Sequence, residues 1–331
     1  MHYSELPYRE RKNFNSIDLM KFIMAWFVVI IHLRPFRLMN PVYTFIFRAL
    51  AARTAVPFFV IASSFFLFRK MSPDAPDFKS VWAFVLRMFK LFGIWTVLLF
   101  VGGTPQLWYL PSMAIGILLL YALVRIKTPA PLIAVLGCGM YLFSAFGLTY
   151  YYLAEETVLH YFAGIYGIVP QLFREGIFFC FPFAVIGMFF AFNDISLPKP
   201  ALFTAFAVSA LAYIADAYLV NNYGFGLDVT SYITLPPIMF FMFLIVLNIE
   251  LPDSPKYRRL RNMSVLIYLL HIIVRYLAAS LLMQLGAFIS FDFESPPLIM
   301  LVTVIILLPL CRGIDRLADK EKYKFLRTLY S

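Results

Sequence analysis

The sequence has little charge and few cysteines for its length. Aspartate, glutamate, lysine and arginine together make up 14% of its 331 residues, whereas a soluble domain has about 25%. Its 3 cysteines, Cys138, Cys180 and Cys311, are scattered through apolar segments and indicate neither a disulfide framework nor a metal cluster. No internal repeat and no low-complexity tract is visible. A water-facing globular fold and a disulfide-stabilised secreted domain are therefore excluded.

Long apolar blocks are what the sequence has in abundance. Hydrophobic residues make up 62% of the chain, and 37 residues are phenylalanine. The blocks run for about 15–21 residues, near the ~20 that an α-helix needs to cross a bilayer, and they lack the period-2 alternation of a barrel strand. The sequence therefore predicts an all-α polytopic membrane protein with about ten transmembrane helices. The predicted spans are residues 17–33, 54–68, 81–101, 107–124, 131–148, 176–192, 202–220, 233–249, 265–285 and 296–310.

The positions of the basic residues predict the orientation. With the N-terminus inside, most of the 28 lysines and arginines fall on cytoplasmic segments, as the positive-inside rule requires. We therefore expect both termini in the cytoplasm: a segment at 1–16, a membrane domain at 17–311, and a basic tail at 312–331 that lies along the inner surface or is simply solvated. The net charge of +10 then reflects topology and contact with membrane lipids, not nucleic-acid binding. The residues that oppose the rule are Arg34, Arg37, Arg48, Arg53 and Arg174.

The first predicted helix, IDLMKFIMAWFVVIIHLRPF, carries three ionisable groups. Lys21 and His32 are 11 residues apart, which places both on one helix face about 16 Å apart along the axis. Asp18 lies one turn before Lys21 on roughly the same side. Ionisable groups inside a membrane span usually mark a functional path. The alternative is that Asp18 and Lys21 anchor the helix at the interface, with Lys21 snorkelling, while His32 is a polar outer cap.

Lys21 with His32, and the segment VPFFVIAS at 56–63, form two N-terminal patterns that resemble those of the membrane-bound acyltransferase 3 family. The first helix of that family carries a basic residue, ten others and then histidine, a pattern that Lys21 and His32 match. Its second helix carries a VPxFFxxSG-like segment. The residues here that resemble this segment are Val56, Pro57, Phe58, Phe59 and Ser63. Ser64 occupies the glycine position, a departure that matters if the backbones approach closely there.

Three later segments extend the resemblance. QLWYL at 106–110 is similar to the family's HLWYL, with Gln106 in place of histidine. FREGIFFCFPFAVIG at 173–187 resembles an RNG-x-F…PF…G segment, with Arg174 matching and Glu175 replacing asparagine. SVLIYLLH at 264–271 is similar to an SxxxYLxH segment that ends, here, on His271. These matches occur in the family's order.

The resemblance implies an acyl-CoA-dependent O-acyltransferase in a bacterial inner or plasma membrane. Such a protein moves an acyl group, often acetyl, from cytoplasmic acyl-CoA to a hydroxyl of an extracytoplasmic glycan or glycolipid. Acyl-CoA is then a co-substrate, and we expect no tightly bound cofactor and no metal. Histidine titrates near pH 6.5, which suits proton transfer from a sugar hydroxyl. His32 is therefore the expected general base, or the group that orients the acceptor hydroxyl.

The other expected catalytic residues are cations and one carboxylate. Lys21 is an expected contact for the coenzyme A phosphates or thioester end. Arg53, Arg174 and Glu175 are expected to bind the acceptor or stabilise the oxyanion, the alternative being a structural salt bridge in which Glu175 pairs with one of the arginines. Further basic residues are candidates for the nucleotide end, although topology alone explains them: Arg87, Lys90, Arg258 and Arg261.

The expected substrate-binding residues all have structural alternatives. They are Asp18, Ser63, Trp108, Tyr109, His271 and Arg275. Ser63 alternatively permits close helix packing, and Trp108 and Tyr109 alternatively belong to an interfacial aromatic belt. His271 and Arg275, four residues apart on one face, alternatively form a helix-packing hydrogen bond. Asp216 has no match in the family pattern and is expected to pair with a buried arginine.

Two other function classes compete with an acyltransferase. A transporter or flippase of about ten helices would also place ionisable groups on one helix face, with prolines breaking spans. Such transporters often contain internal repeats, and none is evident here. A non-catalytic membrane subunit would not need polar positions in this order.

Overall fold

The structure is a computed structural model of the chain, and it describes residues 13–37, 40–72, 76–98, 105–155, 157–228, 230–289 and 296–330. The chain divides into two compact units. Unit 1 comprises Met1–Ser16, Val56–Lys90 and Trp108–Leu251, and unit 2 comprises Ile17–Ala55, Leu91–Leu107 and Pro252–Ser331. Both units are therefore assembled from segments far apart in sequence. Most of the predicted N-terminal segment 1–16, with Arg9, Arg11 and Lys12, lies outside the described residues.

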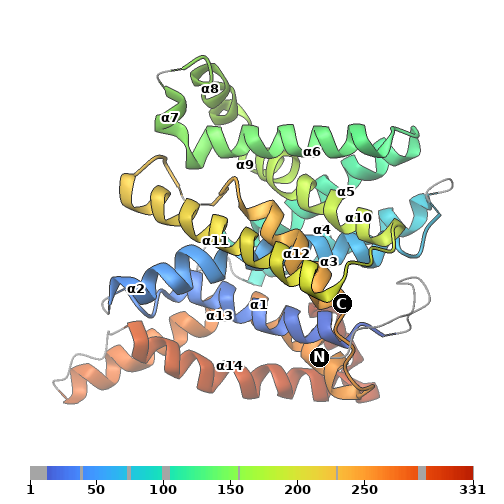
Figure 1. Ribbon diagram of the computed structural model, residues 1–331. Helices are drawn as coiled ribbons and strands as arrows, with labels where there is room; N and C mark the ends of the chain where they lie inside the picture. The colour runs from blue at the N-terminus through green and yellow to red at the C-terminus, as the bar shows by residue number, and fades with distance from the viewer. Residues whose placement is uncertain are drawn as a thin grey trace. The chain divides into compact units, whose positions relative to one another are not determined.

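The described residues are almost entirely helical (Figure 1). The α-helices are α1 (Asn15–Leu33), α2 (Pro41–Thr44), α3 (Ala55–Phe68), α4 (Phe78–Leu98), α5 (Tyr109–Arg125), α6 (Ala130–Ser144), α7 (Tyr151–Glu155), α8 (His160–Ile168), α9 (Gln171–Arg174), α10 (Phe181–Phe192), α11 (Lys199–Tyr223), α12 (Leu235–Leu247), α13 (Pro255–Ile289) and α14 (Pro296–Ala318).

Short helical segments of other geometry join several of these helices. Three are π-helical: η1 (Phe45–Leu50), η4 (Ala145–Thr149) and η5 (Glu175–Cys180). Three are 3₁₀-helical: η2 (Ala51–Thr54), η3 (Pro105–Trp108) and η6 (Glu321–Leu329). π-Helical turns are rare and often occur at functional sites.

The helices confirm an all-α polytopic membrane protein. In the described residues, eight helices have the length and hydropathy of a membrane span, and two apolar helices, Tyr109–Arg125 and Leu235–Asn248, are shorter. Each predicted span overlaps one of these ten helices, and residues 99–101 of the third span lie outside the described residues. The number of crossings and the side on which the termini lie remain predictions.

Two segments predicted as connections are helical instead. Residues 41–54 continue directly into α3, so that one helical run extends over Pro41–Phe68. The predicted connection near 149–173 contains α7, α8 and α9. Sequence reasoning missed α8 because its 9 residues extend only about 14 Å, less than half of the ~30 Å hydrocarbon core. A segment too short to cross the bilayer does not stand out in a search for membrane spans.

Within unit 1, glycines bring α5 and η5 into backbone contact. A Cβ atom on Gly116 would lie 2.8 Å from the Gly176 carbonyl oxygen, and one on Gly176 would lie 2.9 Å from the Ser112 carbonyl oxygen. Moving a side chain could not relieve either contact, because in both cases the nearest atom is a backbone carbonyl oxygen. The glycine of the FREG segment therefore allows the helix that begins at Glu175 to pack directly on α5.

A second close approach, between α3 and α10, accommodates the serine at position 64. Ser64 is fully buried, and its Oγ donates a hydrogen bond to the Ala184 carbonyl oxygen at 2.6 Å. A Cβ on Gly187 would overlap the Ile61 carbonyl oxygen and lie 2.7 Å from Ser64 Cβ. The two helices thus meet closely even though this chain has serine at the family's glycine position, because α10 supplies the glycine.

Within unit 2, α13 and α14 lie side by side (Figure 1). Asn262 Nδ2, near the start of α13, donates to Asp315 Oδ1 near the end of α14 at 2.8 Å, so the two helices are antiparallel. The expected tail boundary at 312 lies inside α14. The chain then forms η6, where Trp95 Nε1 donates to the Leu329 carbonyl oxygen at 2.8 Å. Burial, with Asp315 nearby, raises the pKa of Tyr330 to about 12. The tail is therefore not a freely solvated end, and its contact with the inner surface remains a prediction.

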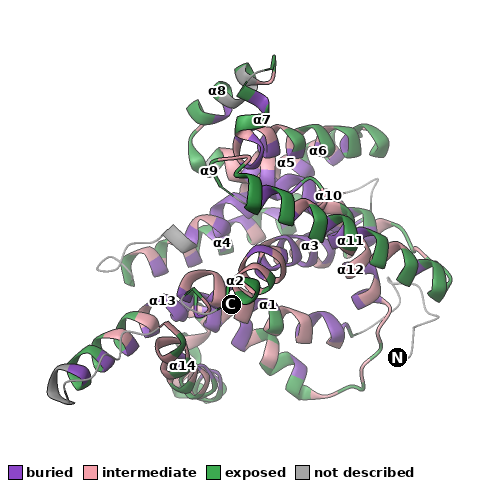
Figure 2. Ribbon diagram, turned by 60° about the vertical axis from the view of Figure 1, so that its left-hand side comes forward, coloured by how far each residue is buried: buried purple, intermediate pink, exposed green. Residues whose placement is uncertain are grey.

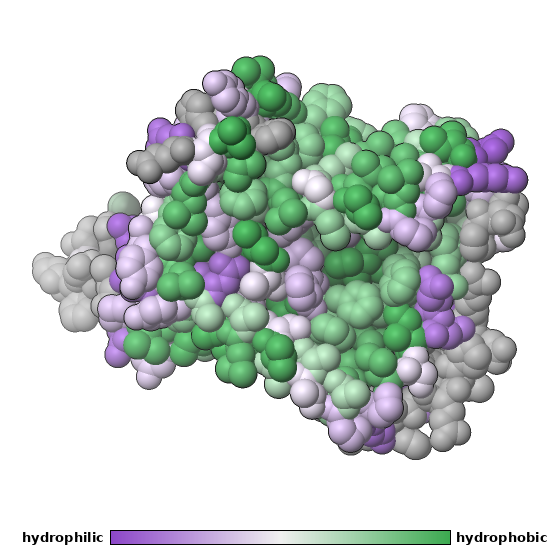
Figure 3. All heavy atoms as spheres, turned by 45° about the horizontal axis from the view of Figure 1, so that its top comes forward, coloured by the Kyte–Doolittle hydropathy of each residue, from purple (hydrophilic) through white to green (hydrophobic). Residues whose placement is uncertain are grey.

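Several helices expose apolar side chains along most of their length. Figure 2 shows α11 mostly exposed, and its outward residues include Val208, Leu211 and Ile214. Hydrophobic residues also dominate the face drawn in Figure 3. An apolar surface of this extent is what contact with lipid tails requires.

The contact at Gly187 predicts a loss of stability on substitution. In Gly187→Ala the added methyl group meets backbone, so we expect a destabilisation of about 1–3 kcal/mol and a lower melting temperature in detergent. Gly139→Ala on α6 is the matched control, because nothing lies within 4 Å of its Cβ. Alanine there should leave stability unchanged or raise it by up to about 1 kcal/mol. Equal melting temperatures for the two variants would contradict the proposed packing.

Candidate functional site

The expected site residues fall into two groups, one in each unit. Unit 2 contains Asp18, Lys21, His32, Arg53, His271 and Arg275. Unit 1 contains Ser63, Trp108, Tyr109, Arg174 and Glu175.

In unit 2 two histidines lie against each other. The ring centroids of His32, on the last turn of α1, and His271, on α13, are 5.1 Å apart with an interplanar angle of 39°. Sequence spacing on α1 predicted the position of His32 near a helix end, and the fold adds the partner, which is 239 residues away in sequence. The contact brings together two residues that the family resemblance identifies separately.

The orientation of the His271 ring is set by its own helix. Its Nδ1 lies 2.6 Å from the Tyr268 carbonyl oxygen, and since a carbonyl oxygen can only accept, Nδ1 carries the proton. The other nitrogen, Nε2, is buried and has no hydrogen-bond partner among the described residues. In the neutral ring Nε2 is an acceptor, so a buried acceptor is available beside His32. The backbone hydrogen bond to Tyr268, and not the predicted hydrogen bond between His271 and Arg275, therefore fixes this ring.

Three arginines lie close enough to His32 to act on it electrostatically: Arg275, Arg34 and Arg53. Arg275 lies one turn after His271 on α13, and Arg53 is half-buried in η2. Negative charge that develops on an oxygen beside His32 would be stabilised by these guanidinium groups. Arg53, whose position opposes the orientation rule, thus lies within electrostatic range of the expected base.

At the other end of α1, Asp18 is buried and paired. Its Oδ2 lies 3.4 Å from Arg261 Nη1, and Lys21 is near enough to interact with the same carboxyl group. Arg261, a candidate for the nucleotide end of acyl-CoA, therefore already has an acidic partner on α1. Asp18 is 7% exposed, so its carboxyl group is buried within the protein. Lys21 is half-buried, and the other candidates, Arg87, Lys90 and Arg258, are exposed.

In unit 1, Arg174 packs on Tyr166 rather than pairing with Glu175. Its guanidinium carbon lies 4.7 Å from the centre of the Tyr166 ring, and Nη1 lies 3.5 Å from the Tyr166 carbonyl oxygen. Within the described residues no ion pair joins Arg174 to Glu175, so that predicted salt bridge is wrong. A pairing of Glu175 with Arg53 stays a prediction. Glu175 is the first residue of the π-helical segment η5.

Tyr166 is a residue of this group that sequence reasoning missed. Burial, with Glu175 nearby, raises the pKa of its hydroxyl above the usual value, so the group stays protonated near neutral pH. Its hydroxyl oxygen lies 3.3 Å from Ser144 Oγ. No signal in the sequence marks Tyr166, because it lies in α8, within a segment predicted as a connection.

The remaining candidates of unit 1 are mostly packed into the protein. Tyr109 is buried, and its hydroxyl contacts Met113 Sδ at 3.0 Å, so it is not a member of an interfacial belt. Trp108 is half-buried with its ring near Phe179. Ser63 is also half-buried, and the serine that packs between helices is its neighbour Ser64.

Asp216 has a different partner from the one expected. Its carboxylate accepts hydrogen bonds from the Tyr150 hydroxyl and from the backbone N–H and Oγ1 of Thr234. The expectation of a buried arginine is therefore wrong, because hydroxyl and amide donors satisfy this carboxylate instead. In the part of the chain that the structure describes, no group of three histidine, cysteine or acidic side chains could hold a metal ion.

Comparison with known proteins identifies relatives with a longer chain. A serine/alanine racemase of Enterococcus gallinarum is 25% identical over 285 residues, which cover 77% of this chain and 40% of the relative. Two amino-acid racemases of Enterococcus faecalis are 26% identical over 54% of this chain and 23% identical over 78% of it. The matches span less than half of the length of these curated relatives. No solved structure matches.

A protein-family model gives the firmer assignment. The acyltransferase 3 model, described as an acyltransferase domain, matches residues 98–314, about two thirds of the chain. The matched range contains the QLWYL, FREG and SVLIYLLH segments, and with them Arg174, Glu175 and His271. The chain therefore belongs to the acyltransferase 3 family.

Proposed function

We propose that this protein transfers an acyl group, acetyl being the expected one, from cytoplasmic acyl-CoA to a hydroxyl of an extracytoplasmic glycan or glycolipid. The acyltransferase domain supports the class of reaction. The observation that carries the proposal is the position of His32, which lies against His271 and within range of three arginines. O-Acetylation of a surface polysaccharide at the cell membrane is the form that we expect.

The transfer needs one base and one stabilised oxyanion. His32 takes the proton of the acceptor hydroxyl while its oxygen attacks the thioester carbonyl carbon, and a new C–O bond forms. The carbonyl oxygen becomes negative, and guanidinium groups such as those of Arg53 and Arg275 stabilise that charge. The C–S bond then breaks, and the proton held by His32 passes to the leaving thiolate. The products are the O-acyl ester and free coenzyme A.

Lys21 and Arg261 support delivery of the donor at the other end of α1. Coenzyme A carries phosphates that require cations, and the end of α1 at which these two residues lie is predicted to face the cytoplasm. Asp18 holds Arg261 in place through the 3.4 Å ion pair. In this proposal Asp18 positions a cation and does not touch the substrate.

The relatives favour one second candidate. They are named racemases of serine, alanine or other amino acids, and this chain matches less than half of their length. A membrane domain attached to an amino-acid racemase could carry the amino acid across the bilayer, which would make this chain a transporter. Inverted vesicles distinguish the two candidates. Label that moves from acetyl-CoA into a glycan fraction supports acyl transfer, and uptake of labelled serine without such transfer supports the transporter.

Replacement of His32 should abolish acyl transfer. Loss of a general base lowers rates by about 10²–10⁴-fold, so we expect His32→Ala to reduce label transfer from acetyl-CoA by at least 100-fold. The measurement is radiolabel in the glycan fraction of inverted vesicles, normalised to protein abundance and to the monodisperse fraction in detergent. Transfer within a few-fold of wild type, at equal abundance, would remove His32 from the mechanism.

Replacement of Lys21 should weaken donor binding selectively. We expect Lys21→Ala to raise KM for acetyl-CoA by about tenfold, because one charge-assisted contact to phosphate is lost, with KM for the acceptor unchanged. Lys127→Gly is the control, since Lys127 is an exposed cation on a segment also predicted to be cytoplasmic. Should both variants change KM equally, general surface charge and not Lys21 would be responsible.

A further inference from the structure

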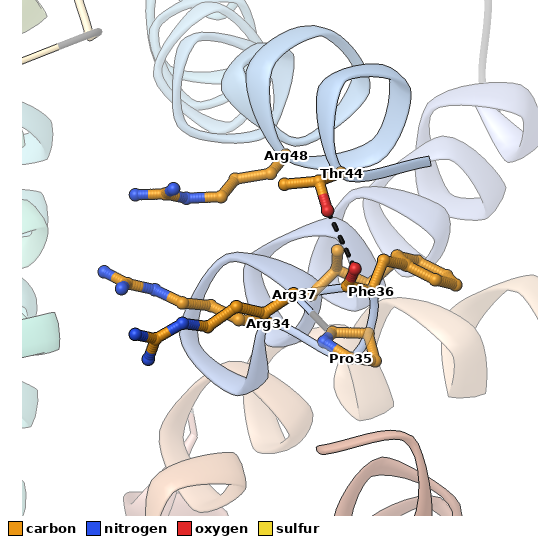
Figure 4. Close-up of a pocket in the computed structure, with 7 residues that line it drawn as sticks. Arg34, Pro35, Phe36, Arg37, Thr44 and Arg48 are labelled. Carbon is orange, nitrogen blue, oxygen red and sulfur yellow. Dashed lines mark hydrogen bonds between the residues drawn. The ribbon is translucent and has the colours of Figure 1, made fainter. Parts of the chain in front are cut away.

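Beyond the end of α1, three arginines line one cavity of about 260 Å³ (Figure 4). Arg34 and Arg37 follow α1, and Arg48 comes from the π-helical segment η1. In Figure 4 the three side chains extend in the same direction, from two neighbouring segments of unit 2. The rest of the lining is uncharged: Ile30, Pro35, Phe36 and Thr44.

The charge of this arginine cluster (Arg34, Arg37 and Arg48) is not explained by topology. All three residues lie on the side predicted to be outside, where the positive-inside rule disfavours them. Neither Arg34 nor Arg37 forms an ion pair with any residue that the structure describes. Arg34 and Arg37 carry like charges close together, and a bound anion would offset their mutual repulsion.

The backbone around the cluster is held in place. Thr44 Oγ1 donates a hydrogen bond to the Phe36 carbonyl oxygen at 2.8 Å and so ties the chain after α1 to α2 (Figure 4). Arg37 N donates to the Arg34 carbonyl oxygen at 3.1 Å. The guanidinium groups of Arg34 and Arg37 therefore project from a turn that hydrogen bonds hold in place.

Arg34 also has an unfavourable backbone conformation. Its φ angle is +49°, in the left-handed region that glycine normally occupies directly after a helix. A non-glycine residue there costs roughly 1 kcal/mol, and strain of this kind is concentrated at functional sites. Arginine therefore occupies a position at which glycine would be less strained.

We propose that the arginine cluster binds a phosphate or carboxylate group of the acceptor, so that the acceptor is an anionic molecule. Arginine presents a planar fork of donors that matches both oxyanions. The cavity is smaller than the roughly 300–1,000 Å³ of sites for drug-sized ligands, so it fits one charged group and not a whole oligosaccharide. Arg34 is two residues after His32 and acts on it electrostatically. An anion held there would fix the acceptor hydroxyl near His32. This inference rests on the proposed function.

The test measures binding of small oxyanions without any acyl transfer. Full-length protein in phosphatidylcholine nanodiscs is titrated with inorganic phosphate and separately with acetate, at constant ionic strength set with chloride. We compare wild type with Arg34→Gly, which removes the guanidinium while relieving the left-handed strain. Lys127→Gly is the matched control, because Lys127 has φ +58° and lies after another helix, α5. We expect Kd for the preferred anion to rise about tenfold in Arg34→Gly alone.

The other outcomes overturn the proposal. Equal Kd values in the three proteins, or the same loss in Lys127→Gly, would show that the cluster is not an oxyanion site. A second set of discs containing phosphatidylglycerol tests the lipid as the source of the anion. If anionic lipid abolishes phosphate binding, the cluster binds a headgroup and the assignment to the acceptor is wrong. Oxyanion binding that persists in a protein without acyl transfer would instead refute the proposed function and leave the site intact.

Discussion

A hydrogen bond within α13 fixes the orientation of the His271 ring: its Nδ1–H donates to the Tyr268 carbonyl oxygen. Its plane is therefore set by the α13 backbone, and its unpartnered Nε2 stays buried. His32 packs against that fixed ring. The proposed role of Arg275, Arg34 and Arg53 depends on this histidine pair. A general base must be oriented before nearby cations can stabilise the charge that it helps to create.

The helix contacts of unit 1 show a different constraint, that of distance between backbones. Where Gly116 meets Gly176, and where Gly187 meets the turn of Ser64, one added methyl group has no space. In a bilayer there is little hydrophobic force between helices, so close contact and interhelical hydrogen bonds supply much of the attraction. The Ser64 hydroxyl contributes such a bond to the Ala184 carbonyl. Serine fits at position 64 because Gly187 on α10 leaves room for the close approach.

The sequence was sufficient to predict the apolar helices, but not how the candidate site residues meet. Apolar blocks of membrane length predict α1 or α13 directly, because only helices and closed barrels span lipid and these blocks lack the alternation of a barrel strand. The contact of His32 with His271 could not be predicted from spacing, since it depends on how two helices far apart in sequence pack. The predicted ion pair of Arg174 with Glu175 is absent from the described residues because adjacent side chains leave a helix in different directions. The Arg174 guanidinium group packs on the ring of Tyr166 instead. Asp216 found hydroxyl donors that no pattern of charges reveals.

The π-helical turns have a consequence for how chain length varies within the family. Each turn at 45–50, 145–149 and 175–180 holds about one residue more than an α-helical turn. A one-residue deletion there would restore ordinary helix and keep the flanking faces in phase. The same deletion in the middle of α10 would rotate every later side chain by about 100°. Single-residue deletions should therefore be tolerated at these three turns, and an alignment that places such gaps elsewhere would pair lipid-facing positions with buried ones.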